Sequence, residues 1–173
     1  SPGLSLAPAR LLLSEFETES AVNSNPDQPF FLRIRNALAQ VEDQYDIVLM
    51  DSPPQLGFLT ISGMAAATSL IVPLTPSMLD VSSTAQFLEL AGAYMGVIED
   101  AGAALQYDHF KFLITRDEPT DMPSQQLTSF MRALFMDRVM AATALKSTAI
   151  SDATMLKQSI YEVVRSEMTR ATY

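Results

Sequence analysis

Apolar residues in this chain fall into two kinds of stretch, short unbroken runs and longer segments with helical spacing. The runs at 47–50 and 70–74 are too short for helices and predict buried strands. Residues 110–115, which include Lys111, predict a third strand that alternates less strictly than a half-exposed one. Strands that alternate with helices along a chain indicate an α/β fold with a parallel sheet. The helical spacing predicts seven helices, at about 9–20, 31–43, 59–67, 80–101, 123–136, 151–157 and 159–171.

Weaker signals mark the boundaries between these elements. Residues 4–7 and 139–141 predict two further short strands, and residues 143–150 predict a loop. Asp80 is placed to cap the long helix that follows the second main strand. That helix is apolar around much of its circumference, so we expect it to be buried on more than one side.

The most informative segment is YDIVLMDSPPQLG, in the first third of the chain. Its apolar run suits a strand buried on both faces, and Asp51 follows at the carboxyl end, where open α/β sheets bind ligands. Pro53 and Pro54 have no backbone N–H, so the chain leaves the sheet there. Gly57 allows a positive φ or a close approach of the backbone to a ligand.

The totals exclude several classes of protein. With 173 residues, 48% of them hydrophobic, the chain can form one domain, residues 1–173, with a sizeable core. No apolar stretch approaches 18 residues, and neither a membrane span nor a secretory signal is indicated. The absence of cysteine fits a reducing cytoplasm, and with His109 as the single histidine we expect no histidine or thiolate metal site.

Charge is distributed unevenly along the chain. The net charge of −9 argues against nucleic-acid binding by the molecule as a whole. Residues 1–110 contain three basic and thirteen acidic side chains, whereas residues 111–173 contain eight basic and seven acidic ones. The cationic groups therefore gather in the last third, where they are either ordinary solvated charges or contacts for an anionic partner.

An Asp that ends a buried apolar strand has the form of a Walker B segment, whose carboxylate helps to hold Mg²⁺ in P-loop nucleotidases. The alternative is that Asp51 only caps the next helix and that the two prolines only end the strand. The phosphate-binding motif G-x-x-x-x-G-K-[ST] is absent, because none of the three lysines follows a glycine.

The string DIVLMDSPPQLGFLTISGMAAATSLIVPL resembles the deviant-Walker P-loop ATPases of the ParA/MinD group. The later string RALFMDRVMAATALKSTAISDATMLKQSIYEV is most similar to the RepA branch, the ParA-type partition proteins of RepABC plasmids. The resemblance implies a parallel-sheet, Rossmann-like P-loop layer fold that lacks its first βαβ unit. It also implies a single incomplete ATPase domain, from Walker B onward, which does not hydrolyse ATP by itself.

The resemblance assigns roles to residues by position. Asp51 matches the Walker B aspartate, a catalytic residue that reaches Mg²⁺ through a water molecule. Pro53, Pro54 and Gly57 match the loop that senses the γ-phosphate. Two further residues, Thr115 and Arg116, match the region near the nucleotide base, although the sequence Thr-Arg-Asp departs from the Asn of some relatives.

Other matched positions concern partners. Asp80 and Ser83 fall in the region that faces the partner subunit, although a plain helix cap is the alternative for Asp80. Each contact of a basic side chain with a DNA phosphate would add to the salt dependence of binding without reading sequence. The basic residues that match the DNA-facing region, or lie beside it, are Arg132, Arg138, Lys146 and Lys157.

For the intact protein, the resemblance implies that ATP and Mg²⁺ drive formation of a homodimer and non-specific DNA binding. A ParB/RepB-type partition protein would stimulate hydrolysis, and the protein would be cytoplasmic and associated with the nucleoid. A MinD-like ATPase is one alternative, but the terminal helix at 159–171 is not a basic membrane-binding helix. A non-enzymatic α/β interaction module, or an autorepressor, is the other.

Overall fold

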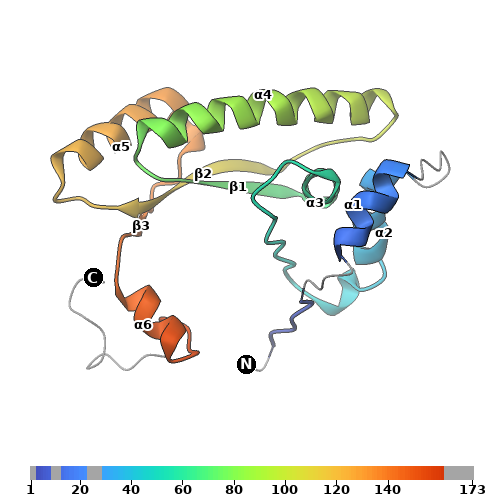
Figure 1. Ribbon diagram of the computed structural model, residues 1–173, viewed down its shortest axis with the longest axis horizontal. Coiled ribbons are helices and arrows are strands. Elements are labelled where there is room, and N and C mark those ends of the chain that lie inside the picture. Colours follow the sequence, from blue (N-terminus) through green and yellow to red (C-terminus); the bar gives the residue numbers. More distant parts are fainter. Residues whose placement is uncertain (1–2, 9–12, 23–28, 162–173) are drawn as a thin grey trace. The chain divides into compact units, whose positions relative to one another are not determined.

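The computed structural model describes residues 3–8, 13–22 and 29–161 (Figure 1). Helices and strands alternate from residue 58 to residue 155, as the sequence predicts. The described helices and strands are α1 (Leu13–Val22), η1 (Phe30–Leu32), α2 (Arg33–Leu38), η2 (Glu42–Gln44), α3 (Phe58–Ala66), β1 (Ser69–Leu74), α4 (Met78–Asp100), β2 (His109–Asp117), α5 (Met122–Phe135), η3 (Met136–Arg138), β3 (Ala144–Leu145) and α6 (Ala149–Met155).

The chain divides into two compact units. Unit 1 contains residues 1–70 and 87–108, and unit 2 contains residues 71–86 and 109–173. Helix α4 contributes its first turns to unit 2 and its remaining turns to unit 1. The two units differ in their central element, which is a helix in unit 1 and the sheet in unit 2.

The parallel sheet has the strand order β1-β2-β3, which confirms the predicted α/β class. Thr115 of β2 pairs with Ala144 of β3, and Asp117 pairs with Leu145. The intervening residue, Arg116, is left over as a bulge, with φ of 52°. The carboxyl end of β2 is therefore the irregular part of the sheet.

The pairing with β3 corrects two predictions made from the sequence. Residues 143–150 are not wholly a loop, because they contain β3 and the start of α6. The strand predicted at 139–141 is reduced to a single bridge, between Val139 and Phe112. A two-residue strand has no periodicity that a sequence pattern could reveal, because it is defined by its partner.

The core of unit 2 lies between β2 and α5. The exposed fractions of Phe112 and Ile114 are 2% and 0%. Phe135 stacks on Phe112 with ring centroids 4.2 Å apart, and Met131 on the same helix is fully buried. Figure 1 shows α5 along one face of the sheet. Pro123 lies in the first turn of α5, where its missing N–H does no harm, as predicted.

The core of unit 1 surrounds α3. Buried Ile61 and Ala65 of α3 pack with Phe31 and with Ile98 of α4. Ser62 is completely buried among them, and its hydroxyl lies 2.7 Å from the Phe58 carbonyl oxygen. The helix predicted at 59–67 is therefore confirmed, and it is the most enclosed element of its unit.

Two predicted strands are wrong. Residues 4–7 form no strand, and Ile47–Met50 runs without regular secondary structure between η2 and α3. The exposed fractions of Ile47 and Leu49 are 76% and 90%, so this run is not buried on either face. Within the described residues no strand lies beside it, and an apolar run without a hydrogen-bonding neighbour cannot form a sheet.

The predicted helices need smaller corrections. The first was predicted at 9–20 and is observed as α1, with residues 9–12 outside the described part; the second, predicted at 31–43, breaks into η1, α2 and η2. Asp80 does not cap α4, because the helix starts at Met78 and the Ser77 hydroxyl accepts a hydrogen bond from the Asp80 amide, 3.1 Å away. Most of the helix predicted at 159–171 lies outside the described residues.

Within the single chain helix α4 buries one side, and its burial on a second side, for which the sequence analysis points to a partner subunit, stays a prediction. The side chains that it buries include Val81, Ala91 and Ile98. The large apolar side chains that it exposes are Met78, Leu79, Leu90, Tyr94 and Val97. The single chain therefore leaves a second apolar side of the helix in contact with solvent.

Candidate functional site

The predicted nucleotide loop lies in unit 1, immediately before α3. Asp51 is exposed, and Pro53 is half-buried next to an exposed Pro54. The Ser52 hydroxyl passes 3.9 Å from the position that a Cβ on Gly63 of α3 would occupy. The loop therefore runs along α3, with the Asp51 carboxylate open to solvent.

Hydrogen bonds fix the end of this loop on the first turn of α3. The Thr60 hydroxyl donates to the Gln55 carbonyl oxygen at 2.6 Å, and the Ile61 amide donates to the Gly57 carbonyl oxygen at 3.0 Å. Leu56 packs against the buried cluster of unit 1. These contacts couple the position of the loop to the position of the helix.

A carboxylate from a distant helix completes the start of α3. Glu17 of α1 accepts hydrogen bonds from the amides of Phe58 and Leu59, each at 3.0 Å. These amides have no partner within the helix, and the positive end of the helix dipole favours a negative charge there. The sequence analysis missed Glu17, because nothing in the local pattern links two segments about 40 residues apart.

Gly57 takes part in a close approach and does not adopt a left-handed conformation. Its φ is −102°, which any residue can adopt. A Cβ at this position would lie 2.7 Å from Oε1 of Glu17, which is closer than real Cβ contacts allow. The group that Gly57 admits in this structure is therefore the Glu17 carboxylate.

The other end of α3 is held by a cation and a phenol. The Arg35 guanidinium donates to the Ala65 carbonyl oxygen, and the Tyr107 hydroxyl donates to the Met64 carbonyl oxygen at 3.0 Å. Burial raises the pKa of the Tyr107 hydroxyl; the nearby Arg35 charge acts against this shift, and Glu99 adds to it. Helix α3 thus has a negative group at its amino end and a positive group at its carboxyl end, as the dipole favours.

The second predicted group of residues lies at the carboxyl edge of the sheet in unit 2. The Thr115 hydroxyl donates to the Leu74 carbonyl oxygen at 3.2 Å, so it ties the ends of β1 and β2 together. Arg116 is exposed and has a positive φ, which is uncommon for a residue with a side chain. The next residue, Asp117, is buried, and its carboxylate accepts from the Thr128 hydroxyl at 3.4 Å.

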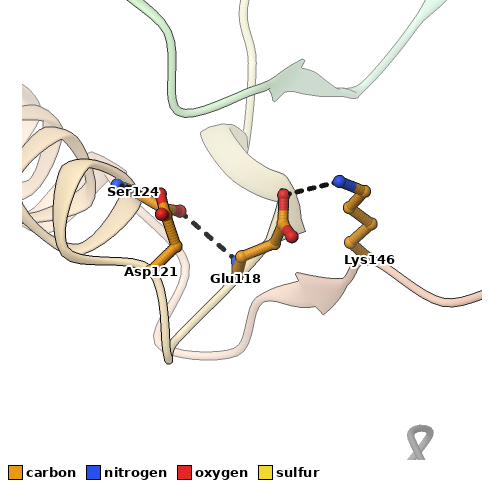
Figure 2. A network of polar contacts seen from close by, with 4 residues as sticks. All are labelled: Glu118, Asp121, Ser124 and Lys146. Carbon is orange, nitrogen blue, oxygen red and sulfur yellow. Dashed lines mark hydrogen bonds and ion pairs between the residues drawn. The ribbon is translucent and has the colours of Figure 1, made fainter.

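A polar network borders this edge (Figure 2). Lys146 forms an ion pair with Glu118, with Nζ 2.8 Å from Oε1, and its backbone amide donates to the Asp117 carbonyl oxygen. The Glu118 amide donates to the Ser124 hydroxyl at 3.3 Å, and the Ser124 amide donates to the Asp121 carboxylate at 3.0 Å. The network therefore joins the bulge of β2, the start of α5 and the residue after β3.

The remaining basic residues have varied surroundings. Arg132 donates to the carbonyl oxygens of Met140 and Ala141, at 3.1 and 3.2 Å. Arg138 lies over the Phe110 ring, 5.8 Å from its centroid. Lys157 is exposed just after α6 and has φ of 53°. Asp80 and Ser83 lie in the first turns of α4.

The described part of the chain contains neither a metal-binding cluster nor a helix that could span a membrane. No cluster of three or more His, Asp or Glu side chains occurs there that could hold a metal ion. Among the described helices, none is long and apolar enough to cross a membrane.

Comparisons with known proteins agree on one family. A family model described as an AAA domain matches residues 1–95. The "Putative replication protein A" of Sinorhizobium fredii is 48% identical over 177 residues, which cover 99% of this chain and 44% of that protein. The "Chromosome-partitioning ATPase Soj" of Treponema pallidum is 49% identical over 43 residues, 25% of this chain and 17% of Soj. This chain therefore spans less than half the length of the Sinorhizobium relative.

Solved structures support the same fold. McdA of Cyanothece in complex with ATP matches with a TM-score of 0.68 and 20% identity, over 87% of this chain and 56% of McdA. At this identity the likeness concerns the fold alone. It confirms the predicted parallel-sheet, P-loop NTPase-like layer fold.

Proposed function

Because this chain belongs to the ParA/MinD-type family of P-loop ATPases, we propose that Asp51 and the loop after it form part of a Mg²⁺·ATP site. Members of this family are ATPases, and they include the plasmid partition proteins. The observation that carries the proposal is the loop from Asp51 to Gly57, which presents an exposed carboxylate and continues directly into α3. The phosphate-binding glycine loop would come from a part of the family domain outside this sequence.

Asp51 has the chemistry for this role. Its carboxylate is exposed, and a carboxylate can hold a hydrated Mg²⁺ through one of the ion's water ligands. Pro53, Pro54 and Gly57 would then sense the γ-phosphate. Because the loop that they form is hydrogen-bonded to α3, a movement of the loop would also move the helix. ATP binding and hydrolysis would in this way bias the position of α3.

The base of the nucleotide would lie at the carboxyl edge of the sheet, where open α/β sheets bind ligands. Arg116 is the better candidate for direct contact, since it is exposed and is held by the bulge. The Thr115 hydroxyl already donates to Leu74, so Thr115 would act through the shape of the strand end.

In the intact protein, we propose ATP-dependent homodimerisation and non-specific DNA binding, with hydrolysis stimulated by a ParB/RepB-type partner. These activities would serve plasmid segregation in the cytoplasm, on the nucleoid. Arg138, Lys146 and Lys157 would contact DNA phosphates, each adding to the salt dependence. Arg132 would also contact a phosphate, through the N–H groups that do not donate to the Met140 and Ala141 carbonyl oxygens.

Calorimetric titration with ATP and Mg²⁺ tests the proposal. The chain would be compared with a chimera that adds the phosphate-loop region of the Sinorhizobium relative. We expect binding by the chimera alone, weakened at least tenfold in Asp51→Asn. Asp46→Asn is the matched control, because Asp46 is an exposed carboxylate in the same segment, and it should leave binding unchanged.

Two results would contradict this function. Equal effects of the two substitutions would reduce Asp51 to a surface charge. The absence of binding by a folded chimera would favour the other function that the sequence allows, a non-enzymatic α/β interaction module.

A further inference from the structure

The proposed function gives no role to the contact between Glu17 and the start of α3. We propose that Glu17 is a positioning residue, a latch that fixes the loop before α3 in one place and has to release for the loop to move. The inference rests on the proposed function only in its second part, the coupling to nucleotide. Its first part, the latch itself, concerns this chain alone.

The latch has a specific geometry. Both carboxylate oxygens of Glu17 are used, Oε2 by the Phe58 amide and Oε1 by the Leu59 amide, each at 3.0 Å. Hydrogen bonds to an ionised group are about twice as strong as neutral ones, and this pair lies at the positive end of a helix.

Gly57 lies directly beside the carboxylate of Glu17. The would-be Cβ of Gly57 is 2.7 Å from Oε1 and 3.0 Å from Oε2 of Glu17. Because Gly57 has an ordinary extended backbone, a side chain here would not strain the backbone, but it would require the Glu17 carboxylate to shift from its present position. The present position of the Glu17 carboxylate therefore depends on the absence of a side chain at residue 57.

The helix that carries Glu17, α1, is itself held by contacts with α2. Arg33 of α2 lies over the Phe16 ring, 5.6 Å from its centroid, and pairs with Glu19 at 3.8 Å. These contacts attach α1 to α2 on either side of Glu17 in the sequence. A shift of the loop and the start of α3 away from α1 therefore has to break the two carboxylate hydrogen bonds.

Amide hydrogen exchange tests the latch in this chain without any nucleotide. In Glu17→Gln the charge is lost, and we expect exchange at Phe58 and Leu59 to become about tenfold faster, as loss of a charge-assisted hydrogen bond predicts. Glu15→Gln changes an exposed residue in the first turn of the same helix and should leave both rates unchanged. Unchanged rates in Glu17→Gln, or equal changes in both variants, would overturn the latch.

A double-mutant cycle tests the same contact by stability, in the Glu17 and Glu17→Ala backgrounds. Gly57→Ala should lower the melting temperature when Glu17 is present and have little effect when Glu17 is alanine, because the clash then disappears. Gly63→Ala is the control, since its new Cβ would meet only Ser52 at an ordinary 3.9 Å. Equal effects of Gly57→Ala in both backgrounds would overturn the proposal.

The coupling to nucleotide is tested in the chimera with ATP and Mg²⁺. If binding requires release of the latch, Glu17→Gln should bind ATP at least threefold more tightly, and Glu15→Gln should not. Unchanged affinity in Glu17→Gln would overturn the coupling. If no chimera binds ATP, the proposed function fails, and the exchange rates and the cycle still decide the latch.

Discussion

The two units of this molecule order their backbones by different means. Unit 2 has a strand, β2, with neighbours β3 and β1, and its core residues Phe112 and Ile114 are almost inaccessible to solvent. Unit 1 depends on a nine-residue helix, α3, whose ends are bound by Glu17 on one side and by Arg35 and Tyr107 on the other.

The same kind of sequence signal behaves differently in the two units. The segment 110–115 becomes part of a strand with buried residues, whereas Ile47–Met50, which is more apolar, stays exposed and irregular. The difference lies in the neighbours, because β2 has hydrogen-bonding partners and Ile47–Met50 has none among the described residues. An apolar run thus predicts what a segment can bury, and its partners decide whether it does so.

The largest effect that separates the two runs should come from truncation of their apolar side chains. Phe112→Ala should lower the free energy of unfolding by about 3–5 kcal/mol, since it removes a buried ring that Phe135 stacks on. Leu49→Ala should change it by less than about 0.5 kcal/mol, because that side chain is exposed. Urea unfolding measures both, and equal losses would break the comparison.

A smaller effect is expected at the start of α5, where unit 2 depends on a local cap. Asp121→Ala should lower the free energy of unfolding by about 1 kcal/mol, because the Asp121 carboxylate accepts a hydrogen bond from the Ser124 amide. Gln126→Ala, an exposed change on the same helix, is the control and should cost almost nothing. If the two variants unfold at the same urea concentration, the cap does not stabilise the helix.

Tyr107 provides a test of comparable size in unit 1. Tyr107→Phe should cost about 1 kcal/mol, the usual value of one hydrogen bond. The raised pKa of Tyr107 also predicts that stability depends on pH. The contribution of the neutral hydroxyl is fully present below the pKa of the unfolded state, and it is lost as pH rises through the higher pKa of the folded state. Stability against pH should therefore fall less steeply in the alkaline range in Tyr107→Phe, and parallel curves would contradict this.

The smallest effect should come from the ion pair in Figure 2. Lys146 and Glu118 are each about half exposed, and such pairs contribute about 0–1 kcal/mol. Glu118→Gln should therefore barely change the unfolding curve. A loss above about 2 kcal/mol would show that polar contacts matter in unit 2 as much as they do around α3.

The sequence predicts α3, α4, α5 and the apolar runs of β1 and β2, because each has a local pattern long enough to read. It predicts the loop from Asp51 to Gly57, and at Gly57 it leaves open a positive φ, which the structure does not show, and a close approach to a ligand. It does not predict Glu17 as the approaching group, nor the bulge at Arg116 or the two-residue strand β3. These features depend on contacts between distant segments, which no local pattern records.

The most direct test of the account is amide exchange at Ile47–Met50, in this chain and in the chimera with the phosphate-loop region. The run is irregular in this chain because no strand lies beside it among the described residues, and a neighbouring strand supplied by the chimera would let its backbone pair. The account predicts fast exchange in the chain and slow exchange in the chimera, with the β2 amides slow in both. Fast exchange at Ile47–Met50 in a folded, ATP-binding chimera would contradict it.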